Sequence, residues 1–313
     1  MPAVTVTAPG KIILLGEHAV VYGQPAIAVP VTELRARAAV TANPNAPSGQ
    51  VLIQAPAVGI SGELTSLPTD QPLAAAILRL LDHLQLSRIP ACTIRITSTI
   101  PVSAGLGSGA AVTIALLRAL SIFLGQRLSN ETINALAFEI EKLHHGTPSG
   151  IDNTVITYAT PVYFVRGQPL ETFQVKTPLH LVIADTGVPG STAKAVADVR
   201  RGWQADPVGF EQRFAEIGSL VVQARRAIES GQPGLLGSLM DRNQALLAEL
   251  GVSSPALDHL VSAARLAGAW GAKLSGGGQG GNLLCLVPAD LQDAICTALL
   301  QQGAVRTVQT ILK

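Results

Sequence analysis

The stretch "IPVSAGLGSGAAVTIALLRAL", residues 100–120, places a glycine-rich loop directly in front of a long apolar run. Gly105, Gly107 and Gly109 fall within five residues, although glycine is unfavourable inside a helix. The run predicts a buried helix that ends just before Gly125. The N–H groups and partial positive charge of a helix N-terminus suit a phosphate, and glycines let the phosphate approach the backbone. The stretch therefore predicts either an anion-binding loop or a tight strand-to-helix turn.

Two familiar phosphate-binding patterns do not explain this loop. Residues 105–110 match G-x-G-x-x-A, the weak form of the dinucleotide-binding fingerprint. That fingerprint needs a second strand ending in an acidic residue about 20 residues later. In this chain the expected place of that acidic residue falls in "GQRLSNE" (125–131), which reads as a loop. The chain also contains no G-x-x-x-x-G-K-[ST], the pattern of the ordinary P-loop. The glycines alone favour a tight turn, so other stretches must decide.

Composition narrows the classes of partner. The chain has 313 residues, 48% of them hydrophobic and 14% charged, which suits one large or two smaller globular domains. The 22 basic and 21 acidic residues give a net charge of +1, which argues against nucleic acid or an acidic membrane as the main partner. The three cysteines are widely spaced, and no signal peptide or membrane span is evident, since Arg118 interrupts the most apolar stretch. We expect a cytoplasmic protein.

Apolar periodicity and turn residues predict an α+β chain with domains 1–177 and 178–313. The first domain is rich in expected strands, including strands over 4–8 and 11–16 and a strand pair over 151–159 and 161–167. In the second domain the expected helices and strands are helices over 192–203, 207–230, 233–249 and 255–267, and strands over 179–187, 282–287 and 305–312.

One helix carries a glutamate at an informative position. Ser129 is a plausible N-cap for a helix that runs toward Gly146. Its inner apolar stripe at helical periodicity comprises Ile133, Leu136, Ala137, Ile140 and His144. Glu141 falls at the border of this stripe, whereas Glu139 points away, and Asp152 follows shortly after a glycine-containing turn. A carboxylate at the edge of a buried face, near a second carboxylate, is a candidate metal ligand or base.

Together with these stretches, "APGKIILLGEHAVVYGQPA" (8–26) places Lys11, Glu17 and His18 within eight residues. The chain resembles the GHMP kinases, a superfamily that includes galactokinase, homoserine kinase, mevalonate kinase and phosphomevalonate kinase. The resemblance covers nearly the whole chain. The three signature motifs of the family are present in order, as "PGKIILLGEHAVVYG", "PVSAGLGSGAA" and "KLSGGGQGG". The first of these has the form typical of the mevalonate kinase branch, and two further segments, "HGTPSGIDN" and "DTGVPGST", also resemble that branch.

The resemblance implies a fold and a reaction. The N-terminal domain would be like the second domain of ribosomal protein S5, and the C-terminal domain would be ferredoxin-like, with the active site between them. The activity would be ATP-dependent phosphorylation of the 5-hydroxyl of mevalonate in isoprenoid precursor synthesis, with Mg²⁺ as the cofactor. Mevalonate and ATP would be the partners. The oligomeric state stays open, with a homodimer as one option.

The resemblance also implies roles for single residues. Asp152 would face the substrate hydroxyl as the base or orienting group, and Lys11 would pair with it. Glu141 and Ser108 would bind magnesium. The predicted substrate contacts are Glu17, His18 and Thr192. The predicted ATP-binding residues are Gly105, Leu106, Gly107, Ser108, Gly109 and Ala110, with the stretch 275–281 behind them. This set suits phosphoryl transfer, which depends on positioning and charge neutralisation.

Three positions depart from the family pattern. Gly109 stands where the family usually has a second serine, whose hydroxyl binds the metal. Gln279 replaces a glycine of the third motif, and Gly190 stands where animal mevalonate kinases carry arginine. The departures suggest a bacterial or archaeal type, and they leave open which groups bind the metal and the substrate carboxylate.

Alternative functions remain at this stage. A kinase for another small alcohol or for phosphomevalonate would share the fold, although the segments "GEHAVVYG" and "HGTPSGIDN" favour mevalonate. A decarboxylase of the same superfamily is disfavoured, because Lys11 and "GEH" stand where that branch has a different first motif. A ligand sensor without catalysis is disfavoured because Lys11, Glu141 and Asp152 are all present.

Overall fold

The computed structural model describes residues 3–102, 104–145 and 148–313, except for the side chains of His144 and His145. Its contacts divide the chain into two compact units. The first unit comprises Met1–Gly10 and Leu34–Ala159, and the second comprises Lys11–Glu33 and Thr160–Lys313. Two long strands, β1 (Val4–Leu15) and β2 (Ala26–Ala42), contribute to both units. The predicted domain bounds of 1–177 and 178–313 stay a prediction.

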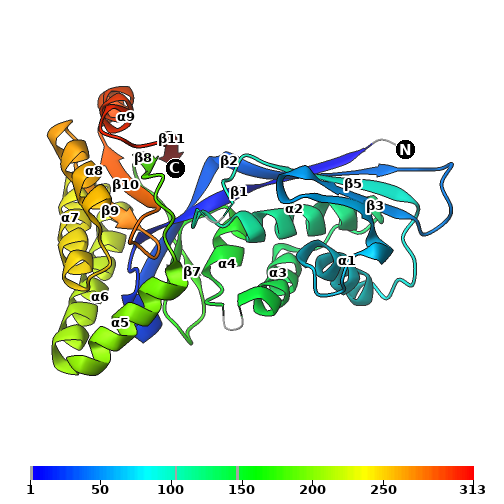
Figure 1. Cartoon of the computed structure of the whole chain (residues 1–313), viewed down its shortest axis with the longest axis horizontal. Helices are drawn as coiled ribbons and strands as arrows, with labels where there is room; N and C mark the ends of the chain where they lie inside the picture. Colours follow the sequence, from blue (N-terminus) through cyan, green and yellow to red (C-terminus); the bar gives the residue numbers. More distant parts are fainter. Residues whose placement is uncertain (1–2, 103, 146–147) are drawn as a thin grey trace. The chain divides into compact units, whose positions relative to one another are not determined.

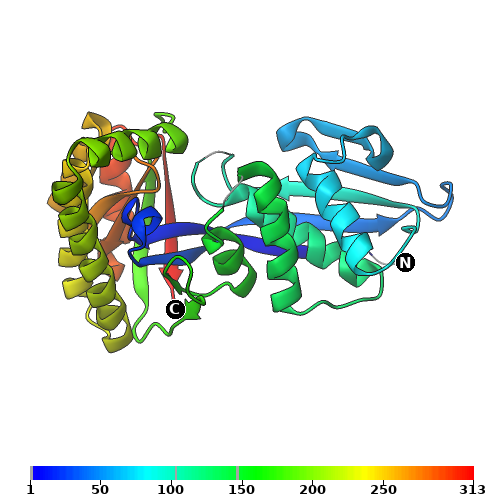
Figure 2. The ribbon, with the colours of Figure 1, turned by 90° about the horizontal axis from the view of Figure 1, so that it is seen from below.

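The first unit is a mixed sheet with helices on one face (Figure 1). Its strands lie in the order β4-β3-β5-β2, with β1 beside β2. β3 and β5 run parallel, whereas β4 is antiparallel to β3 and β2 to β5. The elements are β3 (Val51–Ala55), η2 (Pro56–Val58), β4 (Ile60–Glu63), η3 (Leu64–Ser66), α1 (Pro72–His83), β5 (Cys92–Ser98), α2 (Ser108–Phe123), α3 (Asn130–His145) and α4 (Ile151–Tyr158). Figure 2 shows these helices in front of the strands when seen from below.

Alternation along β2 explains why the helices gather on one face. Ala36, Ala38 and Val40 are buried, whereas Arg35 and Arg37, which alternate with the two alanines, are exposed. Successive side chains of a strand point to opposite faces, so the small apolar set faces the helices. Of these helices, α2 is the most apolar and contacts α1, α3 and α4. It therefore forms the centre of this unit, as its apolar run predicts.

Two expectations about the first half were wrong. The predicted strand over 151–159 is the helix α4, because its β-branched residues are buried against α2 and α3 and tertiary packing overrides their local preference for strands. Only Val162–Phe164 of the expected partner forms a strand, β6. The strands predicted over 4–8 and 11–16 are one strand, β1, which continues through Pro9 and Gly10.

The second unit contains a four-stranded antiparallel sheet in the order β11-β8-β10-β9. With one strand, a helical segment, a strand pair, a helix and a last strand, this order is that of a ferredoxin-like fold. The elements are η1 (Ala19–Tyr22), β6, β7 (Glu171–Thr172), β8 (Leu179–Asp185), α5 (Thr192–Ala205), α6 (Pro207–Ser230), α7 (Pro233–Glu249), α8 (Pro255–Leu266), β9 (Gly271–Ser275), β10 (Asn282–Val287), η4 (Ala289–Leu291), α9 (Gln292–Gln301) and β11 (Arg306–Leu312).

Local signals define the helices of this unit well. Asp206 caps α6 by accepting a hydrogen bond from the backbone N–H of Gly209 at 3.0 Å, and Pro207 occupies the first turn. The helix ends before Gly231, which adopts φ +73°. The predicted helices over 207–230 and 233–249 are confirmed to the residue.

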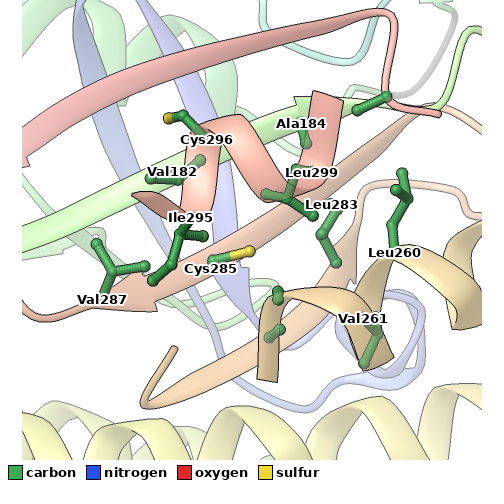
Figure 3. Close-up of a cluster of buried hydrophobic side chains, with 13 residues drawn as sticks. Val182, Ala184, Leu260, Val261, Leu283, Cys285, Val287, Ile295, Cys296 and Leu299 are labelled. Carbon is green, nitrogen blue, oxygen red and sulfur yellow. The ribbon is translucent and has the colours of Figure 1, made fainter. Parts of the chain in front are cut away.

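A hydrophobic core joins the sheet of the second unit to α8 and α9 (Figure 3). Val182 of β8, Leu283 of β10, Leu260 of α8 and Leu299 of α9 meet in it. The cysteines Cys285 and Cys296 belong to the same cluster, and all three cysteines of the chain are free and buried. Across the described residues, no helix is long and apolar enough to cross a membrane.

Candidate active site

The glycine loop opens directly onto the N-terminus of α2. Gly105 and Gly107 both adopt φ +72°, a conformation that residues with a side chain rarely adopt. Gly107 is the N-cap residue and has no side chain that could cap the first turn, while its carbonyl accepts the N–H of Ala111 at 2.9 Å. Ser108 and Gly109 begin the helix. The first turn therefore presents backbone N–H groups without a side-chain cap, as a phosphate-binding terminus requires.

Gly10 of β1 explains how this loop is held against the sheet. An ideal Cβ on Gly10 would lie 3.2 Å from the backbone oxygen of Leu106. The side chain of Leu106 is buried, so the loop is anchored by this leucine. Any role of Leu106 in ATP binding would therefore use its backbone. The first-motif glycine and the second-motif loop are thus two parts of one packed arrangement.

Glu141 of α3 faces the start of α2. A Cβ on Gly109 would lie 3.9 Å from the Oε1 atom of Glu141. Glu141 is half-buried, whereas Glu139 is exposed and pairs with Lys142 at 2.7 Å. The helical-face prediction for these two glutamates is confirmed. A carboxylate beside a helix N-terminus can share a cation with an anion bound there.

Asp152 lies in the first turn of α4, in the same unit as Glu141. Its position is fixed by its neighbour Asn153, which is buried and donates to the Asn134 Oδ1 atom of α3 at 2.6 Å. Gly150 is the N-cap at φ +84° and lies against the ring of Phe138. Asp152 itself is half-buried. The link from Asn153 to Asn134 was not predicted, because an amide pair leaves no periodic signal in a sequence.

Part of the predicted motif lies outside the described residues. Gly146 and Thr147 of "HGTPSGIDN", and Ser103 of "PVSAGLGSGAA", belong to this part. The expectation that His144 belongs to the inner stripe of α3 concerns a side chain that is likewise not described.

In the second unit, the structure brings His18, Thr192 and the third glycine stretch together. The Nε2 atom of His18 lies 3.0 Å from the carbonyl oxygen of Gly277. Thr192 begins α5, and its Cα and Oγ1 atoms would lie 2.8 and 2.9 Å from a Cβ on Gly277. Burial lowers the pKa of His18, which keeps the ring neutral. Two predicted substrate contacts and the third motif therefore share one site.

The other predicted residues of the first motif are buried. Lys11 is 7% exposed and lies in the part of β1 that belongs to the second unit. Glu17 is 4% exposed, and its carboxylate binds Lys273 through Oε1 and accepts from the Asn243 side chain through Oε2 at 3.4 Å. This favours a positioning role for Glu17 over the predicted substrate contact. The predicted pairing of Lys11 with Asp152 joins residues of different units and stays a prediction.

Comparison with known proteins agrees with this geometry. A model of the GHMP kinases N terminal domain matches residues 72–160, and a model of the GHMP kinases C terminal domain matches residues 224–305. The mevalonate kinase of Pyrococcus abyssi is 38% identical to the chain over an alignment of 328 positions, gaps included, which covers 99% of this chain and 96% of the relative. The chain belongs to the GHMP kinases. The mevalonate kinase of Thermococcus gammatolerans is also 38% identical, with 99% and 96% covered.

Solved structures of mevalonate kinases are also similar to this GHMP kinase. The L. major mevalonate kinase in complex with R-mevalonate has a TM-score of 0.85 and 32% identity, covering 99% of this chain and 95% of that one. The Methanococcus jannaschii mevalonate kinase has a TM-score of 0.87 and 26% identity, covering 100% and 99%. A Streptococcus pneumoniae phosphomevalonate kinase has a TM-score of 0.81 but only 16% identity, which shows a shared fold alone.

Two departures of this GHMP kinase from the family pattern have local structural correlates. A Cβ on Gly190 would lie 2.8 Å from the carbonyl oxygen of Gly278, so the backbone here leaves no room for a side chain. Gln279 adopts φ +58° and connects two side chains of α5. It donates to Asp198 at 3.0 Å and accepts from Lys194 at 3.0 Å. The third motif is thus tied to α5 by a side chain that a glycine could not provide.

Proposed function

We propose that this GHMP kinase transfers the γ-phosphoryl group of ATP to the 5-hydroxyl of mevalonate, giving 5-phosphomevalonate and ADP in isoprenoid precursor synthesis. The observation that carries the proposal is the 38% identity to mevalonate kinases over 99% of the chain. Lys11, Glu141 and Asp152, which the reaction requires by resemblance, are all present.

The phosphates of ATP would lie at the start of α2. The backbone N–H groups of residues 105–110 and the positive end of the helix would bind them, with Ser108 supplying a hydroxyl at the first turn. The absence of a side-chain cap at Gly107 supports this assignment. Gly105 and Gly107 keep the loop in a conformation that other residues would strain.

Mg²⁺ fits the oxygen donors beside this helix. Glu141 offers a carboxylate facing Gly109, and Ser108 offers a hydroxyl. The described residues contain no group of three or more His, Cys, Asp or Glu side chains that could hold a metal ion. Such a donor set suits Mg²⁺, which uses one or two carboxylates together with substrate phosphates and water. When bound, the ion would neutralise charge on the transferred phosphoryl group.

The roles proposed on the acceptor side are those that the family resemblance implies. Asp152 would accept the proton of the mevalonate hydroxyl or orient it, and Lys11 would hold charge near the phosphoryl group. His18 and Thr192, which lie together on Gly277, would contact mevalonate. We also propose a cytoplasmic location, which the three free cysteines support.

An ADP-release assay over a panel of acceptors tests the proposal. The panel contains mevalonate, phosphomevalonate, galactose and homoserine, each with Mg·ATP. We expect the highest kcat/KM with mevalonate. Asp152→Asn protein, purified in the same way, controls for contaminating kinases. A panel in which mevalonate is inert, or in which another acceptor is preferred, refutes the assignment.

A further inference from the structure

A fully buried lysine lies next to the acceptor side of the site, and the proposed reaction does not use it directly. Lys273 lies in β9 and has no exposed surface. Its ammonium group binds the Glu17 carboxylate and donates to the carbonyl oxygen of Leu274 at 2.5 Å. A charge without solvent must be paired and hydrogen-bonded. Replacing such a pair by apolar residues is often neutral for stability, so the presence of the pair is weak evidence that it serves stability.

Alternate residues of the same segment contact one stretch of the first motif. Lys273 binds Glu17, the Ser275 hydroxyl donates to the carbonyl oxygen of Ile13 at 2.8 Å, and the Gly277 carbonyl lies 3.0 Å from the His18 ring. Lys273 and Ser275 lie two residues apart in β9, so their side chains point toward the same side of the strand, and Gly277 follows just beyond the end of the strand. The contacts therefore fix the segment 13–18 at three points.

The edge of β9 that does not pair with β10 is held by α7. The Gln244 side chain accepts from the N–H of Leu274 at 2.8 Å, and Asp241 accepts from the N–H of Ala272 at 2.9 Å. Asn243 of the same helix is fully buried and donates to Glu17. Glu17 is thus bound by one side chain from β9 and one from α7. Both of these elements are regular and well packed, so the carboxylate has a rigid frame.

His18 needs such a frame because its backbone is strained. It adopts φ +60°, one of the few positive φ values among the described residues other than glycine. This conformation persists only when the surroundings impose it. A carbonyl oxygen can only accept a hydrogen bond. The Nε2 atom of His18 therefore carries a proton and donates a hydrogen bond to the carbonyl oxygen of Gly277. The Nδ1 atom of the neutral ring is then an acceptor.

We propose that Lys273 is a positioning residue, which acts through Glu17 to hold His18 so that its Nδ1 atom accepts a hydrogen bond from a hydroxyl group of the substrate. The proposal rests on the proposed function for the identity of that substrate. It assigns Glu17 and Asn243 to the same frame. None of the three needs to touch the substrate itself.

Kinetics of a double variant test the proposal. Lys273→Met with Glu17→Gln removes both charges and leaves no uncompensated buried ion, so the fold should survive. We expect kcat/KM for mevalonate to fall about 10- to 100-fold, as for a misplaced binding group, while KM for ATP changes less than about twofold. The matched control is Arg242→Met with Glu216→Gln, which removes another pair of opposite charges, between α7 and α6, and should leave KM for mevalonate unchanged. A folded double variant with wild-type kinetics overturns the proposal.

A second measurement does not depend on the substrate. Nitrogen-15 NMR of the imidazoles, assigned with His18→Asn, should show the proton of His18 on Nε2 in the wild type and loss of this single tautomer in the double variant. A wild-type His18 protonated on Nδ1 overturns the proposal even if the double variant fails to fold. Inactivity of the wild type on mevalonate would refute the proposed function instead, and the NMR result would still decide the role of Lys273.

Discussion

The two glycine-rich loops of this kinase have similar compositions but opposite surroundings. The first glycine loop, residues 105–109, leaves space at two of its glycines: among the described residues, no atom lies within 4 Å of a Cβ on Gly105, and the Glu141 carboxylate lies 3.9 Å from one on Gly109. In the second glycine loop, residues 275–281, three glycines are crowded, namely Gly277, Gly278 and Gly280, whereas Gly276 has no described atom within 4 Å of its Cβ position. A Cβ on Gly278 would lie 2.1 Å from the carbonyl oxygen of Val252, and one on Gly280 would lie 2.5 Å from that of Val188.

The difference shows that glycine is required for two separate reasons. In the first glycine loop, small residues leave space that the protein does not fill, as a binding loop for phosphates needs. In the second, the space is filled by backbone from the segments after α7 and before α5, so glycine permits close packing. Changes near the first loop should therefore affect catalysis, and changes within the second should affect stability.

The largest effect on catalysis should come from Asp152→Asn, in the unit of the first glycine loop. The change would remove the charge that we propose to face the reacting hydroxyl. We expect kcat to fall about 10²- to 10⁴-fold, while binding of ATP is retained. Stability should change by less than about 1 kcal/mol, the size of a helix N-terminal charge effect.

Steady-state kinetics and a urea melt of the same preparation measure both quantities. If the variant keeps near wild-type kcat, Asp152 is not the base. If it loses activity only because it unfolds, the contrast between the two loops fails.

Gly278→Ala should have the largest effect on stability. The new methyl group would overlap the Val252 carbonyl, and the residue would be strained at φ +77°. Together these effects should lower the free energy of unfolding by about 2–5 kcal/mol. Gly276→Ala is the matched control, because Gly276 has φ +86° but nothing within 4 Å of its Cβ position.

The control should cost only about 1–2 kcal/mol, the strain of the left-handed conformation alone. Urea unfolding of both variants measures the difference. Equal losses would mean that backbone strain, and not crowding, explains the glycines of the second loop.

Fold prediction from the sequence succeeded where the signals are local. The helices α6 and α7 begin at prolines and end at residues that the sequence identifies, since caps and prolines act through neighbouring atoms. It failed at α4, where Ile151, Val155 and Ile156 prefer strands locally but are buried against other helices. It also divided β1 at Pro9, although the strand continues there.

Prediction of the site likewise succeeded where the signal is local and failed where it depends on residues far apart in the chain. The inward turn of Glu141 follows from helical periodicity, and the structure agrees. The roles given to Glu141, Asp152 and Lys11 came from the family resemblance and stay predictions. The pair of Lys273 with Glu17 was missed, because 256 residues separate the partners and a single sequence carries no signal of such contacts. The lone lysine in the buried run "GAKLS" was the only hint.

Glu141→Gln should have a smaller effect than the two changes above. It would replace the proposed anionic ligand of a hard cation by a neutral one, so we expect the Mg²⁺ concentration for half-maximal rate to rise roughly tenfold. Glu139→Gln is the control, because Glu139 is exposed on the same helix and pairs with Lys142. Mg²⁺ titrations of the initial rate compare them, and equal effects would remove the helical-face argument.

The smallest effect should come from Gly109→Ser, which restores the usual family residue in the first glycine loop. The new Cβ would lie 3.9 Å from Glu141 Oε1, which is an ordinary contact, and Gly109 does not adopt a positive φ. We expect activity within a few-fold of wild type and a gain in stability of up to about 1 kcal/mol, because glycine is unfavourable in a helix.

Ser108→Ala should instead lower kcat more than it lowers stability, since Ser108 would supply the remaining hydroxyl. Kinetics, ATP binding and thermal melts of the two variants test this. A folded Gly109→Ser enzyme that no longer binds ATP would show that the phosphates themselves occupy the space at Gly109, and that glycine there serves close approach of the ligand.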